Sequence, residues 1–120
     1  MNKGYRDITR GVSASLSKFR ADMPELMKSF TALAQAATLG GLLDHKTKEL
    51  IALSLGVAGH CDACIGFHTQ ALAKAGASRA EVEEALGVAV YMGGGPSLMY
   101  AANALAAFEE LVQPAETLTG

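Results

Sequence analysis

Apolar residues recur at intervals of three and four positions along nearly the whole chain, and no segment sustains the apolar-polar alternation typical of a strand. Turn-forming residues separate the periodic stretches, among them Gly40-Gly41, Gly76 and the run Gly93-Gly94-Gly95-Pro96. Amphipathic helices of this kind bury their apolar stripes against one another. The pattern therefore predicts an all-α fold, a single-domain bundle of about six helices that spans residues 1–120, with its core at about 23–112.

Capping signals place the helix boundaries. Asp22, followed by Pro24, predicts a capping box that starts the second helix, Asp44 predicts the N-cap of the third, and Ser78 predicts a second capping box. The segment after Pro114 is expected to fray. We expect helices over about 5–20, 23–39, 45–59, 61–75, 79–92 and 96–112.

The third of these helices is apolar on every side over residues 50–57, which predicts a central, buried position. Half of all residues are hydrophobic and only 18% are charged, against roughly 25% in an ordinary soluble domain. This composition predicts a homo-oligomer, in which alanine-rich faces such as residues 101–107 pack against other copies of the chain.

The formal net charge is −2, so the chain lacks the basic surface that a nucleic acid requires. No apolar stretch approaches the ~20 residues that span a bilayer, and the N-terminal sequence MNKGYRDITRG has no apolar region of the kind found in secretory signals. We therefore expect a cytoplasmic protein with no nucleic-acid or membrane partner. In that compartment, a close cysteine pair is more often catalytic or metal-binding than a permanent crosslink.

Both cysteines of the chain lie in the segment HCDACIGFH, residues 60–68. On a helix, Cys61, Cys64 and His68 fall on one face. Cα atoms three residues apart on a helix are separated by about 5 Å, a distance that a disulfide accepts. The free N–H groups at the start of the helix would stabilise a thiolate at Cys61, and His68 could accept a thiol proton.

Two other interpretations of the cysteines remain open at this stage, zinc binding and simple burial. A zinc site needs four ligands in tetrahedral geometry and usually has a second pair of ligands elsewhere in the sequence. Here the candidates are Cys61, Cys64, His68 and His60, all of them local and three of them on one helical face. The spacing favours a redox dithiol, without a metal.

Glu49 is the candidate that could orient His68, because it directly precedes an apolar run and would be partly shielded from water. The alternative is a surface acid paired with Lys46 or Lys48. For His60, a capping or packing role is the main expectation and a supporting catalytic role is the alternative.

Glu49, Cys61-x-x-Cys64 and His68, at these spacings, resemble the alkylhydroperoxidase D-like proteins of the carboxymuconolactone decarboxylase superfamily. The resemblance implies an all-helical protein that assembles into trimers or hexamers. It also implies that Cys61 and Cys64 form a redox-active disulfide, with Glu49 and His68 as a proton relay and no other cofactor. The substrate would be a hydroperoxide and the reductant an external dithiol. One departure is Ala63, where well-studied members have a histidine.

The leading prediction is thus an enzyme, a thiol-dependent peroxidase. Two alternatives are a lyase of the carboxymuconolactone decarboxylase type, which does not depend on a cysteine pair, and a non-catalytic oligomer whose dithiol senses redox state. Which cysteine attacks first stays open, since Cys61 has the helix terminus and Cys64 has the nearer histidine.

Overall fold

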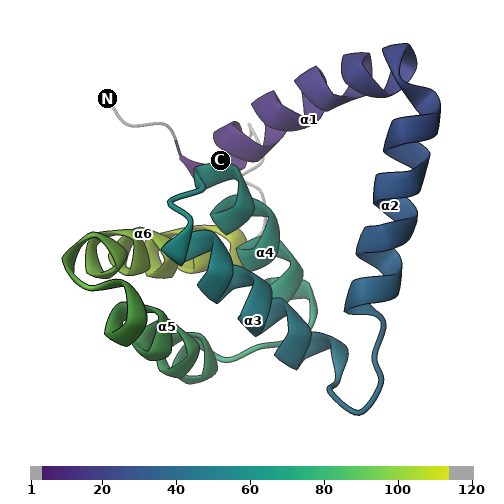
Figure 1. Cartoon of the computed structure of the whole chain (residues 1–120). Coiled ribbons are helices and arrows are strands. Elements are labelled where there is room, and N and C mark those ends of the chain that lie inside the picture. Colours follow the sequence, from purple (N-terminus) through teal and green to yellow (C-terminus); the bar gives the residue numbers. More distant parts are fainter. Residues whose placement is uncertain (1–3, 114–120) are drawn as a thin grey trace.

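The computed structural model describes residues 4–113, and within this range it contains six α-helices and no strand (Figure 1). The expected fraying after Pro114 lies outside the described residues. The all-α prediction is confirmed. In chain order the helices are α1 (Tyr5–Asp22), α2 (Pro24–Thr38), α3 (His45–Ala58), α4 (Asp62–Lys74), α5 (Arg79–Gly93) and α6 (Gly95–Val112).

Two predicted caps are present. The carboxylate of Asp44 accepts a hydrogen bond of 2.8 Å from the amide of Thr47, which starts α3. Ser78 and Glu81 form the complete capping box at the start of α5, each side chain accepting from the other residue's amide. These caps satisfy amide groups that a helix start leaves without partners, so local sequence fixes where both helices begin.

The capping box predicted at Asp22 is wrong. Helix α1 continues through Asp22, and the N-cap of α2 is Met23, which makes no side-chain capping bond. Pro24 explains the position of the break, because a residue that precedes proline is disfavoured in the α conformation. Met23 accordingly has φ −130° and ψ 64°. The proline rule therefore prevails over the cap signal one residue earlier.

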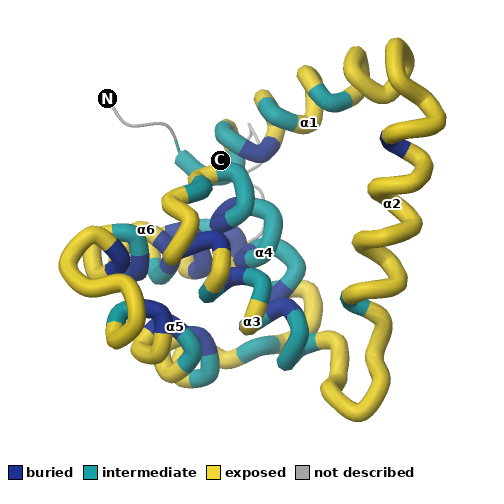
Figure 2. Tube along the Cα trace, in the orientation of Figure 1, coloured by how far each residue is buried: buried dark blue, intermediate teal, exposed yellow. Residues whose placement is uncertain are grey.

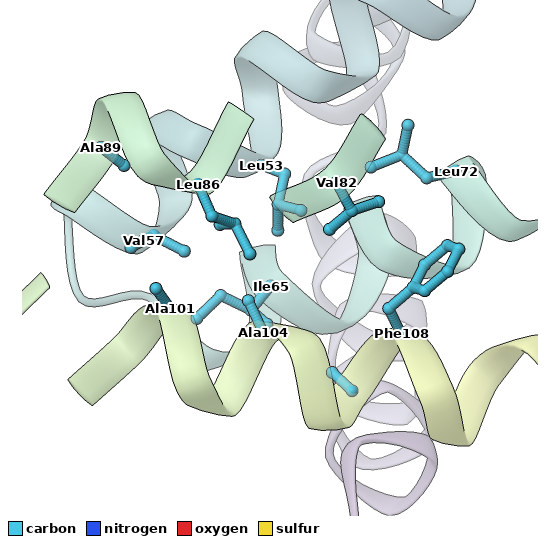
Figure 3. Close-up of a cluster of buried hydrophobic side chains, with 11 residues drawn as sticks. Leu53, Val57, Ile65, Leu72, Val82, Leu86, Ala89, Ala101, Ala104 and Phe108 are labelled. Atoms are coloured by element: carbon cyan, nitrogen blue, oxygen red, sulfur yellow. The ribbon is translucent and has the colours of Figure 1, made fainter. Parts of the chain in front are cut away.

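Helices α3 to α6 form the body of the molecule, and the start of α1 packs across α4 (Figure 1). Each of the four body helices contributes to one apolar cluster (Figure 3). Its buried members are Leu53, Val57, Ile65, Leu72, Val82, Leu86, Ala89, Ala101, Ala104, Ala107 and Phe108. Three of the alanines expected to face other copies therefore lie in the chain's own core.

Helix α2 and the end of α1 form an arm that projects from this body (Figures 1 and 2). Met27 is the one buried residue of α2, whereas Phe30 on the same helix is 60% exposed. The prediction that residues 50–57 are buried on every side is also wrong in part, because Ile51 and Leu55 are 46% and 67% exposed. Together with Ala85 and Val88 of α5, those two side chains line an open apolar pocket.

Within residues 4–113, no helix combines the length and the apolar character needed to cross a membrane.

Candidate redox site

Cys61 and Cys64 are joined by a disulfide at the start of α4, with their Cα atoms 5.2 Å apart. Cys61 is the N-cap of the helix, and its Sγ atom accepts a hydrogen bond of 3.2 Å from the amide of Cys64. Both side chains are partly buried. The helix N-terminus therefore acts directly on the Cys61 sulfur, as the sequence predicts, and would stabilise negative charge there.

The close approach of α3 to α4 beside the disulfide depends on Gly56. A Cβ atom at this position would lie 3.1 Å from the Cβ atom of Cys64, tighter than ordinary van der Waals contact. The amide of Cys61 donates to the carbonyl of Gly56 at 3.0 Å. The absence of a side chain thus lets the dithiol lie directly against α3.

His68 lies on α4, seven residues after Cys61, and its Nδ1 atom is 2.7 Å from Oε1 of Glu49 on α3. Glu49 is only 5% exposed, so the alternative of a surface acid is wrong. The lysines proposed as its partners bond elsewhere. Lys46 forms an ion pair with Glu81 at 2.8 Å, and Lys48 donates to the carbonyl of Leu39 at 2.7 Å.

His45 also belongs to this cluster, although it was not among the site residues expected from the sequence. Its ring is about half exposed, with Nε2 3.8 Å from the second carboxylate oxygen of Glu49 and Nδ1 2.8 Å from the carbonyl of Thr38. The signal was present, because His45 and Glu49 are four residues apart on a helix and such residues are neighbours. Glu49 thus joins an inner histidine, His68, to an outer one.

His60, the possible supporting residue, stacks its ring on Tyr100 of α6. The structure shows it in the turn before α4, and the packing role expected for it is observed. Among the described residues, no group of three or more histidine, cysteine, aspartate or glutamate side chains is arranged to hold a metal ion.

Tyr5 of α1 contacts the start of α4, and this contact was not expected from the sequence. Its hydroxyl donates a hydrogen bond of 3.4 Å to Oδ1 of Asp62, the residue after Cys61. Burial raises the pKa of Tyr5 to about 12, and the neighbouring negative charge of Asp62 adds to the effect. No sequence signal links two residues 57 positions apart; only the packing of α1 on α4 brings them together.

Residues 24–107 match the sequence model of the carboxymuconolactone decarboxylase family. The chain therefore belongs to the carboxymuconolactone decarboxylase family, and the predicted family resemblance is confirmed. An uncharacterized protein from Cupriavidus necator is 43% identical over 88 residues, which cover 73% of this chain and 78% of that protein.

Solved structures agree with this assignment. A carboxymuconolactone decarboxylase family protein from Legionella pneumophila is 60% identical and superposes with a TM-score of 0.90, over 91% of this chain and 97% of that one. A second family member, from Thermotoga maritima, is 32% identical with a TM-score of 0.76, over 86% of this chain and 88% of that one. The Thermotoga protein has been suggested to take part in an antioxidative response.

Proposed function

We propose that this protein is a thiol-dependent peroxidase, which reduces hydroperoxides with the Cys61–Cys64 dithiol and is itself reduced by an external dithiol. The observation that carries the proposal is the arrangement on α4: the dithiol starts the helix, and His68, one turn beyond Cys64, is hydrogen-bonded to the buried carboxylate of Glu49. A thiol, a base and a group that orients the base are the parts that activated nucleophiles require.

The reaction has three balanced steps. A cysteine thiolate attacks the O–O bond of the hydroperoxide, so that a sulfenic acid forms and the alcohol leaves after taking up a proton. The second cysteine attacks the sulfenic sulfur, the S–S bond forms and water leaves. An external dithiol then reduces the disulfide by exchange and is oxidised in turn.

His68 and Glu49 would move the protons of these steps. Because Nδ1 of His68 bonds to Glu49, Nε2 is the ring nitrogen that would exchange a proton with the thiols or with the leaving oxygen. The carboxylate would fix the ring orientation and compensate the positive charge that the ring acquires. The suggested antioxidative role of the Thermotoga relative supports the same chemistry.

The test follows thiol oxidation in the purified, reduced protein after addition of tert-butyl hydroperoxide. We expect the loss of two thiols per peroxide in the wild type, and a single sulfenic acid, trapped with dimedone, in whichever of Cys61→Ser and Cys64→Ser retains the attacking cysteine. His68→Ala should slow thiol loss by about a hundredfold, the lower end of a typical general-base contribution. Gln70→Ala, on the same helix, is the matched control and should react like the wild type.

Persistence of both thiols at millimolar peroxide would show that the peroxidase proposal is wrong. Decarboxylation of a carboxymuconolactone that survives both cysteine substitutions would favour the lyase alternative. Rapid disulfide formation without turnover in the presence of an external dithiol would favour a redox sensor.

We also propose a homo-oligomer, with the trimer and the hexamer as the candidate forms. The support is the apolar surface left uncovered on two parts of the chain. Leu26, Phe30 and Leu33 are at least half exposed on the α2 arm, and Ile51 and Leu55 are exposed on α3. A monomer in water rarely leaves large apolar surfaces uncovered.

A further inference from the structure

The turn between α3 and α4 has an uncommon backbone conformation directly before the dithiol. His60 has φ 55°, and among residues 4–113 it is the one non-glycine residue with a positive φ. This left-handed conformation is disfavoured for residues with a Cβ atom, and it persists where surrounding contacts hold it in place.

A contact of this kind is present at His60. The imidazole ring lies parallel to the ring of Tyr100, with 4.6 Å between the ring centroids and 5° between the planes. Tyr100 belongs to α6 and is partly buried against the apolar cluster of the body, whereas His60 itself is exposed. The stacked rings thus connect an exposed turn to the core of the protein.

The conformation of this turn decides where the Cys61 sulfur lies. The amide of His60 donates to the carbonyl of Val57 at 3.1 Å, and the chain then turns so that Cys61 becomes the N-cap of α4. In this position Sγ accepts the hydrogen bond from the Cys64 amide. A Cys61 thiolate would keep this bond and the field of the helix N-terminus only while the turn keeps its shape.

Charged and titratable groups from four helices lie along the first two turns of α4. Asp62 and His68 belong to α4, Tyr5 comes from α1, Tyr100 from α6, and Glu49 of α3 is bonded to His68. A carboxylate adjacent to Cys61 opposes a thiolate there, and the Tyr5 hydroxyl donates to that carboxylate. The favourable contribution of the helix N-terminus therefore has a competitor, which makes the position of the sulfur matter more.

We propose that His60 and Tyr100 are positioning residues, whose stacked rings hold the α3–α4 turn so that Cys61 stays at the N-cap of α4 after the disulfide is reduced. The consequence is a stabilised Cys61 thiolate in the reduced protein. The inference rests on the proposed function only because that function gives the Cys61 thiolate a chemical role. It assigns no contact with the peroxide to either ring.

The test measures the pH at which Cys61 ionises, from its ultraviolet thiolate absorbance. The background is Cys64→Ser, which leaves one thiol and keeps the backbone amide that bonds to Sγ. In this background, we expect His60→Gly to raise the midpoint by about half a pH unit, the size of a typical effect of a helix terminus on a charge. Glycine accepts a positive φ without strain. This change therefore removes the stacked ring while the backbone conformation of the turn stays sterically allowed.

Substitutions on α6 provide the second set of variants. Tyr100→Leu removes the stacking partner and should raise the midpoint by the same amount, whereas Tyr100→Phe keeps an aromatic ring and should leave it unchanged. Because the two rings act as one unit, the double variant His60→Gly/Tyr100→Leu should shift the midpoint no further than either single change. Tyr91→Leu is the matched control, since Tyr91 is an exposed tyrosine on α5.

An unchanged midpoint in folded His60→Gly protein would overturn the proposal, and so would equal shifts in Tyr100→Leu and Tyr100→Phe. If Tyr100→Leu fails to fold, His60→Gly still tests the proposal, because His60 is exposed and its substitution should not prevent folding. No peroxide is present in this experiment, so its outcome is independent of whether the protein is a peroxidase.

Discussion

The Nδ1 atom of His68 lies 2.7 Å from Oε1 of Glu49, although the two residues belong to different helices and are 19 positions apart. Glu49 is buried and His68 is partly exposed, so the pair extends from the interior of the helix bundle to the face that carries Cys64. A buried carboxylate is costly unless it is hydrogen-bonded, and His68 supplies this partner. The bond therefore serves the fold and orients the ring at once.

Replacing Glu49 tests the orienting role. Glu49→Gln keeps an oxygen that can accept from Nδ1 and removes the negative charge, so the imidazole loses the group that compensates its positive charge. We expect the rate of peroxide-driven disulfide formation to fall about tenfold, which corresponds to a loss of about 1.4 kcal/mol of charge compensation in the transition state. Stopped-flow measurement of thiol loss checks this, with the exposed Glu84→Gln as the control. A rate equal to that of the wild type would remove Glu49 from the mechanism.

The raised pKa of Tyr5 implies that the folded protein loses stability in alkali. Its pKa is about 12 in the folded protein against an ordinary value of 10.0, so the folded state holds this proton more tightly than the unfolded chain does. The stabilisation is present in full below pH 10 and is lost as the pH rises towards 12. Urea unfolding at a series of pH values should show the free energy of unfolding falling over this window.

The comparison that isolates Tyr5 is Tyr5→Phe, which removes the hydroxyl and nothing else. We expect its free energy of unfolding to fall less steeply between pH 10 and 12. If both proteins show the same slope, the hydroxyl does not titrate in the way that its partial burial and its contact with Asp62 imply.

A charge introduced into the apolar stripe of the α2 arm should change the assembly state of the protein. Phe30→Glu places a charge among the exposed apolar side chains of α2, and burying an unpaired charge at an interface is strongly unfavourable. We expect light scattering after size exclusion to show a smaller species than the wild type. Ser29→Glu adds the same charge at the adjacent exposed position and should leave the assembly intact. A wild-type protein that is already monomeric at micromolar concentration would contradict the proposed oligomer.

The lack of a side chain at Gly66 allows α1 to pack closely on α4. A Cβ atom at this position would lie 2.5 Å from Cγ2 of Thr9, so Gly66→Ala forces the two helices apart. We expect a loss of about 2 kcal/mol in the free energy of unfolding, which is typical of overpacking. Thr9→Ser removes Cγ2 and keeps the hydroxyl that bonds to the carbonyl of Arg6, so the double variant should regain part of this loss. Chemical denaturation of the four proteins checks both steps.

Local rules in the sequence predict most of the helix boundaries. Asp44 and Ser78 act as caps because a cap needs only its own residue and the amides two or three positions later. Asp22 fails because Pro24 restricts the residue before it, and that restriction is local as well. Six helices in the right order are therefore predictable from the sequence.

The candidate site is predictable only in part. The common face of Cys61, Cys64 and His68 follows from helix geometry, but the hydrogen bond from His68 to Glu49 depends on how α3 and α4 pack. The contacts of Tyr5 with Asp62 and of His60 with Tyr100 join helices distant in sequence. Apolar periodicity shows that a helix has an apolar stripe, but it does not show whether that stripe packs on the chain's own core or on another surface. The exposure of the α2 stripe could therefore not be predicted from the sequence.

The position of Cys61 as N-cap has a consequence for chemical modification of the protein. The Cys61 sulfur accepts the hydrogen bond from the Cys64 amide, so an alkylating reagent at Cys61 of the reduced protein would block a thiol and remove a helix cap together. Amide hydrogen exchange at Cys64 should then accelerate, while exchange in α5 and α6 stays slow. Modification of one side chain would thus be readable as local fraying of the first turn of α4.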